Sequence, residues 1–318
     1  LEIIEKINNM KIPYWYPTDR MIEGSESRRN DKFGITHVHH FYTKRNLFAL
    51  SYIFKFIKDN DFLKFIFTSI NPRLVTKMSV YRVGRGKSNL TSGTLYVPSF
   101  NSDYNVIETY RSKFKTILNA LSKLKYNVED KIISTCSTTD ISGLDDNTID
   151  YIFTDPPFGS NLNYSELNFI WEAWLKVKTS NKSEAIINKV QNKGLVEYQE
   201  LMTKCFEEYY RVLKPNRWIT VEFHNSKNSV WNAIQESLLR AGFIIADVRT
   251  LDKKQGSFKQ VTTTTAVKQD LIISAYKPKE NFKRRFLEKA GTEDTVWEFV
   301  REHLEKLPVV VQKGNTIE

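Results

Sequence analysis

The segment Asp155-Pro-Pro-Phe158 contains the residues of this chain that are best suited to catalysis. A short apolar run, Tyr151-Ile-Phe153, precedes it, and the two prolines exclude a continued helix or strand ladder. The sequence therefore predicts a turn that leaves Asp155 just beyond the end of a strand. Its carboxylate and the carbonyl of Pro156 would give two acceptors for one amino group, and Phe158 a flat face for stacking.

This set of groups suits chemistry at an exocyclic amino nitrogen of a base. Such a nitrogen is a poor nucleophile because its lone pair is delocalised into the ring. Two acceptors that hold its hydrogens favour the tetrahedral form and stabilise the positive charge that develops during attack on a methyl group. No strong general base is needed before attack. An aromatic side chain can stack on a base that has been extruded from its helix.

The motif resembles the (D/N/S)-PP-(Y/F) element of methyltransferases that modify exocyclic amino groups of nucleic-acid bases. Its surroundings agree: an acidic stretch, Leu144-Asp-Asp-Asn-Thr-Ile149, leads into the strand, and Leu213-Lys-Pro215 ends a later helix before another strand. This order is similar to that of class I, S-adenosylmethionine-dependent methyltransferases. The resemblance implies that Asp155, Pro156, Pro157 and Phe158 form the catalytic motif at a ligand cleft.

The implied fold is α/β, a Rossmann-like sheet that is mostly parallel with a closing antiparallel hairpin, over about residues 130–277. Hydrophobic periodicity and the breakers Pro215 and Gly242 set the expected boundaries. Strands are expected at Lys131–Thr135, Tyr151–Thr154, Trp218–Phe223, Phe243–Arg249 and Leu271–Tyr276, and helices at Ser165–Lys176, Val196–Leu213 and Ser229–Ala241.

A mixed α+β region is expected before this sheet. Apolar residues recur at helical spacing over 44–70 and 106–124, and Met78–Val83 and Gly93–Val97 suggest a hairpin. We therefore expect an N-terminal region at 1–128 that contacts DNA or a partner, a catalytic domain at 129–278, and a helical tail at 279–318.

The resemblance also implies S-adenosylmethionine as the methyl donor, bound near Asp140, Thr154 and Asp155. The glycine-rich loop that holds the methionine end of this cofactor in the family has no counterpart in the sequence. The segment Tyr42-Thr-Lys-Arg-Asn-Leu47 resembles one that follows the cofactor half in large bacterial DNA methylases. We therefore expect an internal piece of a longer chain, whose glycine-rich loop comes from an upstream segment or a partner chain.

Composition favours a nucleic-acid partner. Lys and Arg number 47 against 37 Asp and Glu, which gives a formal net charge of +10. The basic residues expected to contact DNA phosphates are Arg85, Lys87, Lys253, Lys254 and Lys259. Two cysteines without metal-ligand spacing indicate a reducing compartment, taken as the cytoplasm, and no metal site or membrane segment is expected.

Together these features predict a site-specific DNA methyltransferase, as in restriction-modification systems, and favour adenine N6 over cytosine N4 as its target. An RNA base amino-methyltransferase remains open, as does a DNA-binding fragment with an incomplete catalytic site. The recognition sequence and the oligomeric state do not follow from the sequence.

Overall fold

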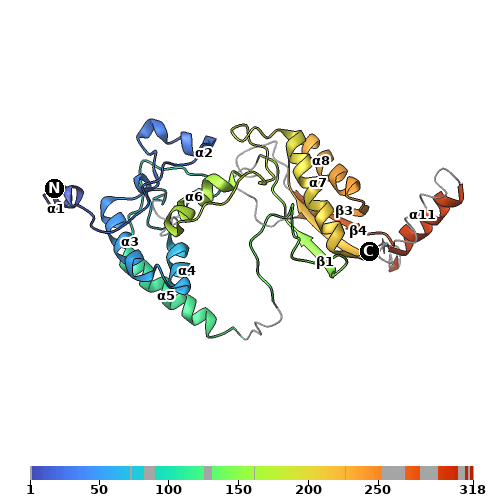
Figure 1. Ribbon diagram of the computed structural model, residues 1–318, viewed down its shortest axis with the longest axis horizontal. Helices are drawn as coiled ribbons and strands as arrows, with labels where there is room; N and C mark the ends of the chain where they lie inside the picture. Colours follow the sequence, from blue (N-terminus) through green and yellow to red (C-terminus); the bar gives the residue numbers. More distant parts are fainter. Residues whose placement is uncertain are drawn as a thin grey trace. The chain divides into compact units, whose positions relative to one another are not determined.

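The computed structural model describes residues 2–71, 74–81, 90–124, 131–160, 162–225, 227–252, 269–279, 293–306, 312–313 and 316–317 (Figure 1). Its helices are α1 (Glu2–Asn9), α2 (Ser25–Arg28), η1 (Asp31–Phe33), η2 (Val38–Phe41), α3 (Lys44–Ile57), α4 (Asp61–Ile70), α5 (Val106–Leu121), α6 (Tyr164–Leu175), α7 (Leu195–Val212), α8 (Asn228–Arg240) and α11 (Glu293–Lys306). Its strands are β1 (Ile149–Thr154), β2 (Leu213–Phe223), β3 (Ile244–Asp252), β4 (Gln269–Tyr276), β5 (Gln312–Lys313) and β6 (Thr316–Ile317).

The chain folds into two compact units. The N-terminal unit comprises Leu1–Ser134 and Asn163–Lys182, and the sheet unit comprises Thr135–Leu162 and Ser183–Glu318. Helix α6 follows the Asp-Pro-Pro-Phe motif in sequence, yet it packs with the N-terminal unit. The expected division into regions at 1–128, 129–278 and 279–318 stays a prediction.

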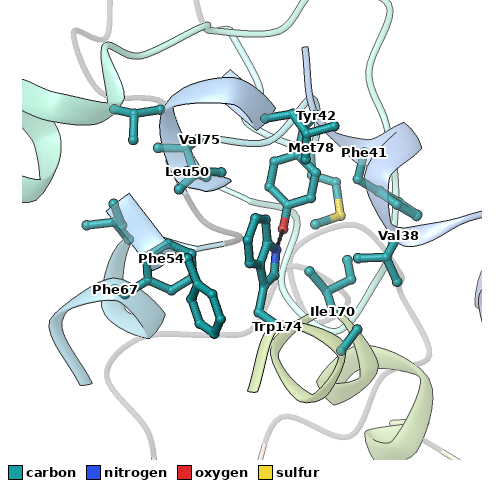
Figure 2. Packing of buried hydrophobic residues seen from close by; sticks show 14 of the residues in the cluster. Val38, Phe41, Tyr42, Leu50, Phe54, Phe67, Val75, Met78, Ile170 and Trp174 are labelled. Atoms are coloured by element: carbon teal, nitrogen blue, oxygen red, sulfur yellow. Dashed lines mark hydrogen bonds between the residues drawn. The ribbon is translucent and has the colours of Figure 1, made fainter. Parts of the chain in front are cut away.

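The core of the N-terminal unit is built around Trp174 of α6 (Figure 2). This side chain is fully buried and meets the rings of Phe54 and Phe67 at centroid distances of 5.5 and 5.2 Å. Its indole Nε1 donates to the hydroxyl of Tyr42 at 2.9 Å, and that hydroxyl donates to Oδ1 of Asn71 at 2.6 Å. Burial raises the pKa of Tyr42 well above its usual range. Helix α6 is thus joined to this unit by apolar packing and by a buried polar chain.

A second contact joins α6 to α2. Oε2 of Glu166 accepts a hydrogen bond from the backbone N–H of Ser27 at 2.7 Å. A Cβ atom at position 24 would lie 1.9 Å from the carboxyl carbon of Glu166, so only glycine admits this approach. Burial raises the pKa of the Glu166 carboxyl.

The prediction of a hairpin in the N-terminal unit is wrong for the residues that the structure describes. Gly93–Val97 forms no strand, and the nearest ladder contact is an isolated antiparallel bridge between Val80 and Asn101. Leu95 is instead buried in the helical core, so its apolar character reflects packing rather than strand pairing.

The sheet unit contains a mixed sheet in the order β1-β2-β4-β3. Strand β1 runs parallel to β2, whereas β4 runs antiparallel to both β2 and β3. The α/β class and the closing antiparallel pair are therefore confirmed. The expectation of a mostly parallel sheet is wrong for the described strands, because only β1 and β2 pair in parallel.

One face of this sheet carries the core of the unit. Ile219, Val221 and Phe223 alternate along β2 with less buried residues, and they pack with α7 and α8. The register places Ile152 of β1 beside Ile219. The period-two pattern of the sequence therefore predicts the buried face of these strands correctly.

The prediction of a strand at Lys131–Thr135 is wrong. These residues form no strand, and Ile132 and Ile133 are 91% and 95% exposed. Paired apolar residues favour a strand only when a neighbouring strand and a covering layer bury them. Within the described residues neither is present at this position.

Two basic side chains fix the entry into β1. Arg211 of α7 donates to Asp146 at 2.7 Å and to the carbonyl of Leu144 at 2.8 Å. Lys277, which is buried, donates to Oδ1 of Asn147 at 2.7 Å and to the carbonyl of Leu213 at 2.9 Å. These bonds hold the loop before β1 against the end of α7.

Among the described residues, no helix is both long enough and apolar enough to cross a membrane.

The Tyr42 hydroxyl yields the first prediction. Tyr42→Phe should lower the free energy of unfolding by about 1–3 kcal/mol, because it leaves the buried Trp174 indole N–H and the Asn71 amide oxygen without this partner. Tyr52→Phe, at an exposed tyrosine of α3, is the matched control. Urea unfolding of both variants measures the difference, and equal stabilities would contradict the assigned role.

Lys277 yields a second prediction. Lys277→Met keeps the aliphatic stem but leaves the carbonyls of Tyr210 and Leu213 without their charged donor. We expect a loss of about 2–3 kcal/mol in unfolding free energy. Lys279→Met, at an exposed site two residues later, should change stability little. If both variants unfold at the same urea concentration, Lys277 does not hold the loop.

Candidate active site

The Asp-Pro-Pro-Phe turn lies where two parallel strands end. Strand β1 ends at Thr154, and Asp155 follows it directly, as the sequence predicts. The register pairs Thr154 with Val221 of β2, which ends at Phe223. The carboxyl ends of the two strands therefore meet at one edge of the sheet, the position at which open α/β sheets bind ligands.

Two side chains anchor the carbonyls of this turn. The hydroxyl of Tyr198 on α7 donates to the carbonyl of Pro157 at 2.7 Å, and Nδ2 of Asn225 donates to the carbonyl of Phe158 at 3.0 Å. In the described part of the chain no hydrogen bond reaches the carbonyl of Pro156. Pro156 is buried, and a buried acceptor of this kind ordinarily has a partner. Asp155, the residue before it, is exposed.

Gly159 ends the turn in a left-handed conformation, with φ of +70°. A Cβ atom there would approach Nδ2 of Asn225 and the side chain of Val230 to 3.4 Å. Asn225 is itself fixed, because its carbonyl accepts a hydrogen bond from Nε1 of Trp231 at 2.8 Å. Glycine therefore allows the chain to reverse against the residue that holds Phe158.

The ring of Phe158 is half-buried beside the end of β2. It meets Phe223 edge-on at a centroid distance of 5.3 Å and His224 at 6.2 Å. These contacts support the ring from the sheet side. Because the ring is only half-buried, part of it stays accessible to a stacking partner.

His224 and Asp270 are site residues that the sequence analysis missed. His224 follows β2 directly, and Asp270 belongs to β4. Nδ1 of the imidazole lies 2.8 Å from Oδ1 of Asp270, close enough for an ion pair though not aligned as a hydrogen bond. The available signal was a histidine at the end of a strand parallel to the one that carries the motif.

The residues expected to bind the cofactor have different surroundings in the structure. Oγ1 of Thr154 lies 3.3 Å from the hydroxyl of Tyr209 on α7. Asp140 is exposed in a turn, where its Oδ1 accepts from the backbone N–H of Ser142 at 3.1 Å. The strand expected before Asp140 is absent, so that strand does not position this carboxylate. A cofactor role for Thr154, Asp140 and Asp155 stays a prediction.

A hydrogen bond to a carboxylate holds the turn that contains Asp140 against α7. Glu208 accepts a hydrogen bond from the backbone N–H of Ile141 at 2.9 Å. Hydrogen bonding to Arg211 holds the pKa of the Glu208 carboxyl below its usual range. This contact fixes the chain just after Asp140 although no strand precedes it.

The basic residues expected to contact DNA are Arg85, Lys87, Lys253, Lys254 and Lys259. They lie outside the described residues. Their role in DNA binding stays a prediction from the sequence.

Comparison of solved structures gives only weak likeness. A candidate DNA modification methylase of Thermus thermophilus, solved with S-adenosyl-L-methionine, shares 12% identity at a TM-score of 0.27, covering 45% of this chain and 53% of that one. A SAM-dependent methyltransferase of Methanosarcina mazei shares 11% identity at a TM-score of 0.28, covering 53% of this chain and 79% of that one. The chain spans about half the length of the Thermus methylase. These similarities are too low to carry a conclusion about this chain.

No curated protein matches the chain significantly. A comparison of the sequence with family models is more informative. A family model described as DNA methylase, for N6 and N4 enzymes, matches residues 149–315. That range is just over half of the chain, and it begins at β1 and contains the anchored Asp-Pro-Pro-Phe turn, β2 and the His224–Asp270 pair. The chain therefore belongs to the N6/N4 DNA methylase family.

Proposed function

We propose that this chain belongs to an enzyme that transfers a methyl group from S-adenosylmethionine to an exocyclic amino group of a DNA base. The chain contains the part of the active site that binds the target base. The observation that carries the proposal is the anchored turn. Tyr198 and Asn225 hold the carbonyls of Pro157 and Phe158, while the Pro156 carbonyl, next to the exposed Asp155, has no hydrogen bond among the described residues.

In this proposal the chain orients and polarises the target nitrogen. Asp155 and the Pro156 carbonyl each accept one N–H of the amino group, which localises the lone pair and aligns it for attack. Both acceptors stabilise the positive charge that develops on nitrogen. Phe158 stacks on the extruded base and so limits its rotation. The donor supplies the electrophilic methyl group, and the contributions described here come from side chains and one backbone carbonyl of this chain.

Adenine N6 is the proposed target rather than cytosine N4. The acid at the first position of the motif supports adenine, since a serine there would favour cytosine N4. An RNA target is the alternative, because similar turns occur in RNA methylases. The family match to DNA methylases favours DNA.

The described residues are better suited to binding the target base than to binding the methyl donor. The N-terminus of α7 is already capped by its own Glu197, whose Oε2 accepts from the N–H of Gly194 at 2.7 Å. It is therefore not available to the carboxylate of a cofactor in the way that open helix N-termini are.

We propose that a further segment, upstream in sequence or in a partner chain, supplies the glycine-rich turn. Strand β1 is the edge of the described sheet, and Tyr151 and Phe153 on its uncovered face are exposed. Strands of parallel sheets are ordinarily buried on both faces. An added strand beside β1 would bury this edge and bring its own turn to the same end of the sheet.

The proposed partner is DNA in the cytoplasm, with the net charge of +10 as support. Arg85, Lys87, Lys253, Lys254 and Lys259 remain the proposed phosphate contacts. A place in a restriction-modification system belongs to the same proposal.

The proposal predicts the effect of changing the motif in the full-length protein. Asp155→Ala should lower methyl transfer by about 10²–10³-fold, because one of the two groups facing the developing charge is lost. Phe158→Ala should weaken productive base binding by about 1–3 kcal/mol, and Phe158→Tyr should be tolerated. Single-turnover assays with radiolabelled donor on duplex DNA measure both effects. Unimpaired transfer by Asp155→Ala would refute the assignment.

The anchors of the turn give a separate prediction. Tyr198→Phe removes the side-chain donor to the Pro157 carbonyl and leaves the backbone N–H of Gly159. It should lower the transfer rate by about tenfold, because the turn that carries the Pro156 carbonyl is held less firmly. Tyr151→Phe removes a tyrosine hydrogen bond of the same 2.7 Å length, to Thr220, away from the turn. The control should retain its rate. Equal rates for the two variants would show that the anchor does not orient the acceptor.

A further inference from the structure

The proposal concerns His224 and Asp270, and it rests on the proposed function. The antiparallel register of β2 and β4 ends with Phe223 opposite Leu271. One residue further, the same register brings His224 opposite Asp270. The pair therefore lies at the sheet edge where β1 delivers the Asp-Pro-Pro-Phe turn.

Burial distinguishes the two partners. The side chain of Asp270 is 4% exposed, whereas that of His224 is 22% exposed. A buried carboxylate 2.8 Å from Nδ1 favours the tautomer that carries its proton on Nδ1, and leaves Nε2 as the basic nitrogen. The partial exposure of the imidazole gives a proton a route onward to solvent.

The imidazole also touches the motif. His224 meets the ring of Phe158 at 6.2 Å, and the next residue, Asn225, holds the Phe158 carbonyl. A base that stacks on Phe158 would come close to His224. Asp270 on β4 is the charged group beside His224, and Glu222 on the same side of β2 and Asp155 after β1 are the other acidic groups at this end of the two strands.

The chemistry leaves one proton to be removed. As the new N–C bond forms, the C–S bond of the sulfonium donor breaks and sulfur keeps its electron pair. The amino nitrogen then carries a methyl group, both hydrogens and a positive charge, so one N–H proton must depart to give the neutral product. Imidazole, with an ordinary pKa of about 6.5, is a better acceptor near neutral pH than a carboxyl group at about 3.9.

We propose that His224, oriented by Asp270, accepts the proton that leaves the amino nitrogen during methyl transfer. The N–H bond breaks with its electron pair retained on nitrogen, and the lone pair of Nε2 forms the new bond. The hydrogen that departs gives up its hydrogen bond to Asp155 or to the Pro156 carbonyl, and the other of these acceptors keeps hold of the amino group. His224 later releases the proton to solvent through its exposed side.

The test is a pH profile of the single-turnover rate constant in the full-length protein with S-adenosylmethionine and duplex DNA. Without substitution, the rate should rise with pH and then level off, as it does when a reaction needs an unprotonated acceptor. His224→Gln should lower the plateau by about 10²-fold and remove this rise. His37→Gln, at a histidine of the N-terminal unit, should keep both. Thermal unfolding of each variant checks that the fold is retained.

A second readout needs neither donor nor DNA. Ring-nitrogen NMR should show His224 with its proton on Nδ1 in the unsubstituted protein, and a mixture of tautomers in Asp270→Asn. Asp270→Asn should also lower the transfer rate, by less than His224→Gln does.

The outcomes separate the two proposals. If the unsubstituted protein transfers no methyl group to DNA, the proposed function fails and the role of His224 fails with it. If it transfers methyl groups and His224→Gln keeps the rise with pH and a rate within about threefold, only the role of His224 is overturned. An unchanged tautomer in Asp270→Asn would overturn the orienting role of Asp270.

Discussion

The site depends on how the carbonyl groups of one turn are used. After β1 the chain passes through two prolines, which contribute no backbone N–H. Within the turn the backbone N–H of Gly159 donates to the carbonyl of Pro157 at 3.0 Å, and the other donors come from outside it. Tyr198 from α7 takes the carbonyl of Pro157, and Asn225 from the end of β2 takes that of Phe158. No described group donates to the carbonyl of Pro156, and the proposal assigns this acceptor to a ligand. The chemistry proposed here follows from this division of acceptors.

The rest of the sheet unit serves this arrangement. Parallel pairing of β1 with β2 brings the turn and residues 223–225 to one edge. The buried side chains of α7 and α8 fix the helix that carries Tyr198. At the opposite end of β1, Lys277 and Arg211 fasten the entering loop to α7. Both ends of β1 are therefore tied to the same helix, which restricts movement of the strand that delivers Asp155.

Much of this unit could be predicted from the sequence, because its elements bury a regular pattern. The expected strands at 151–154, 243–249 and 271–276, and the helices beside them, match the observed elements closely, whereas the strand expected at 218–223 begins earlier, at Leu213. The strand at Lys131–Thr135 failed because apolar character alone does not supply a pairing partner. The pair of His224 and Asp270 could not be predicted, since it requires the register of two strands separated by more than forty residues. Likewise, the sequence contains no signal that Tyr198, from the first turn of a distant helix, would reach Pro157.

The central claim is that this turn acts on an exocyclic amino group. The most direct measurement is nucleoside mass spectrometry of duplex DNA incubated with the full-length protein and isotopically labelled S-adenosylmethionine. The account predicts label on the exocyclic nitrogen of adenine, as N6-methyladenine. Label on a ring carbon or a ring nitrogen, with none on an amino group, would contradict it.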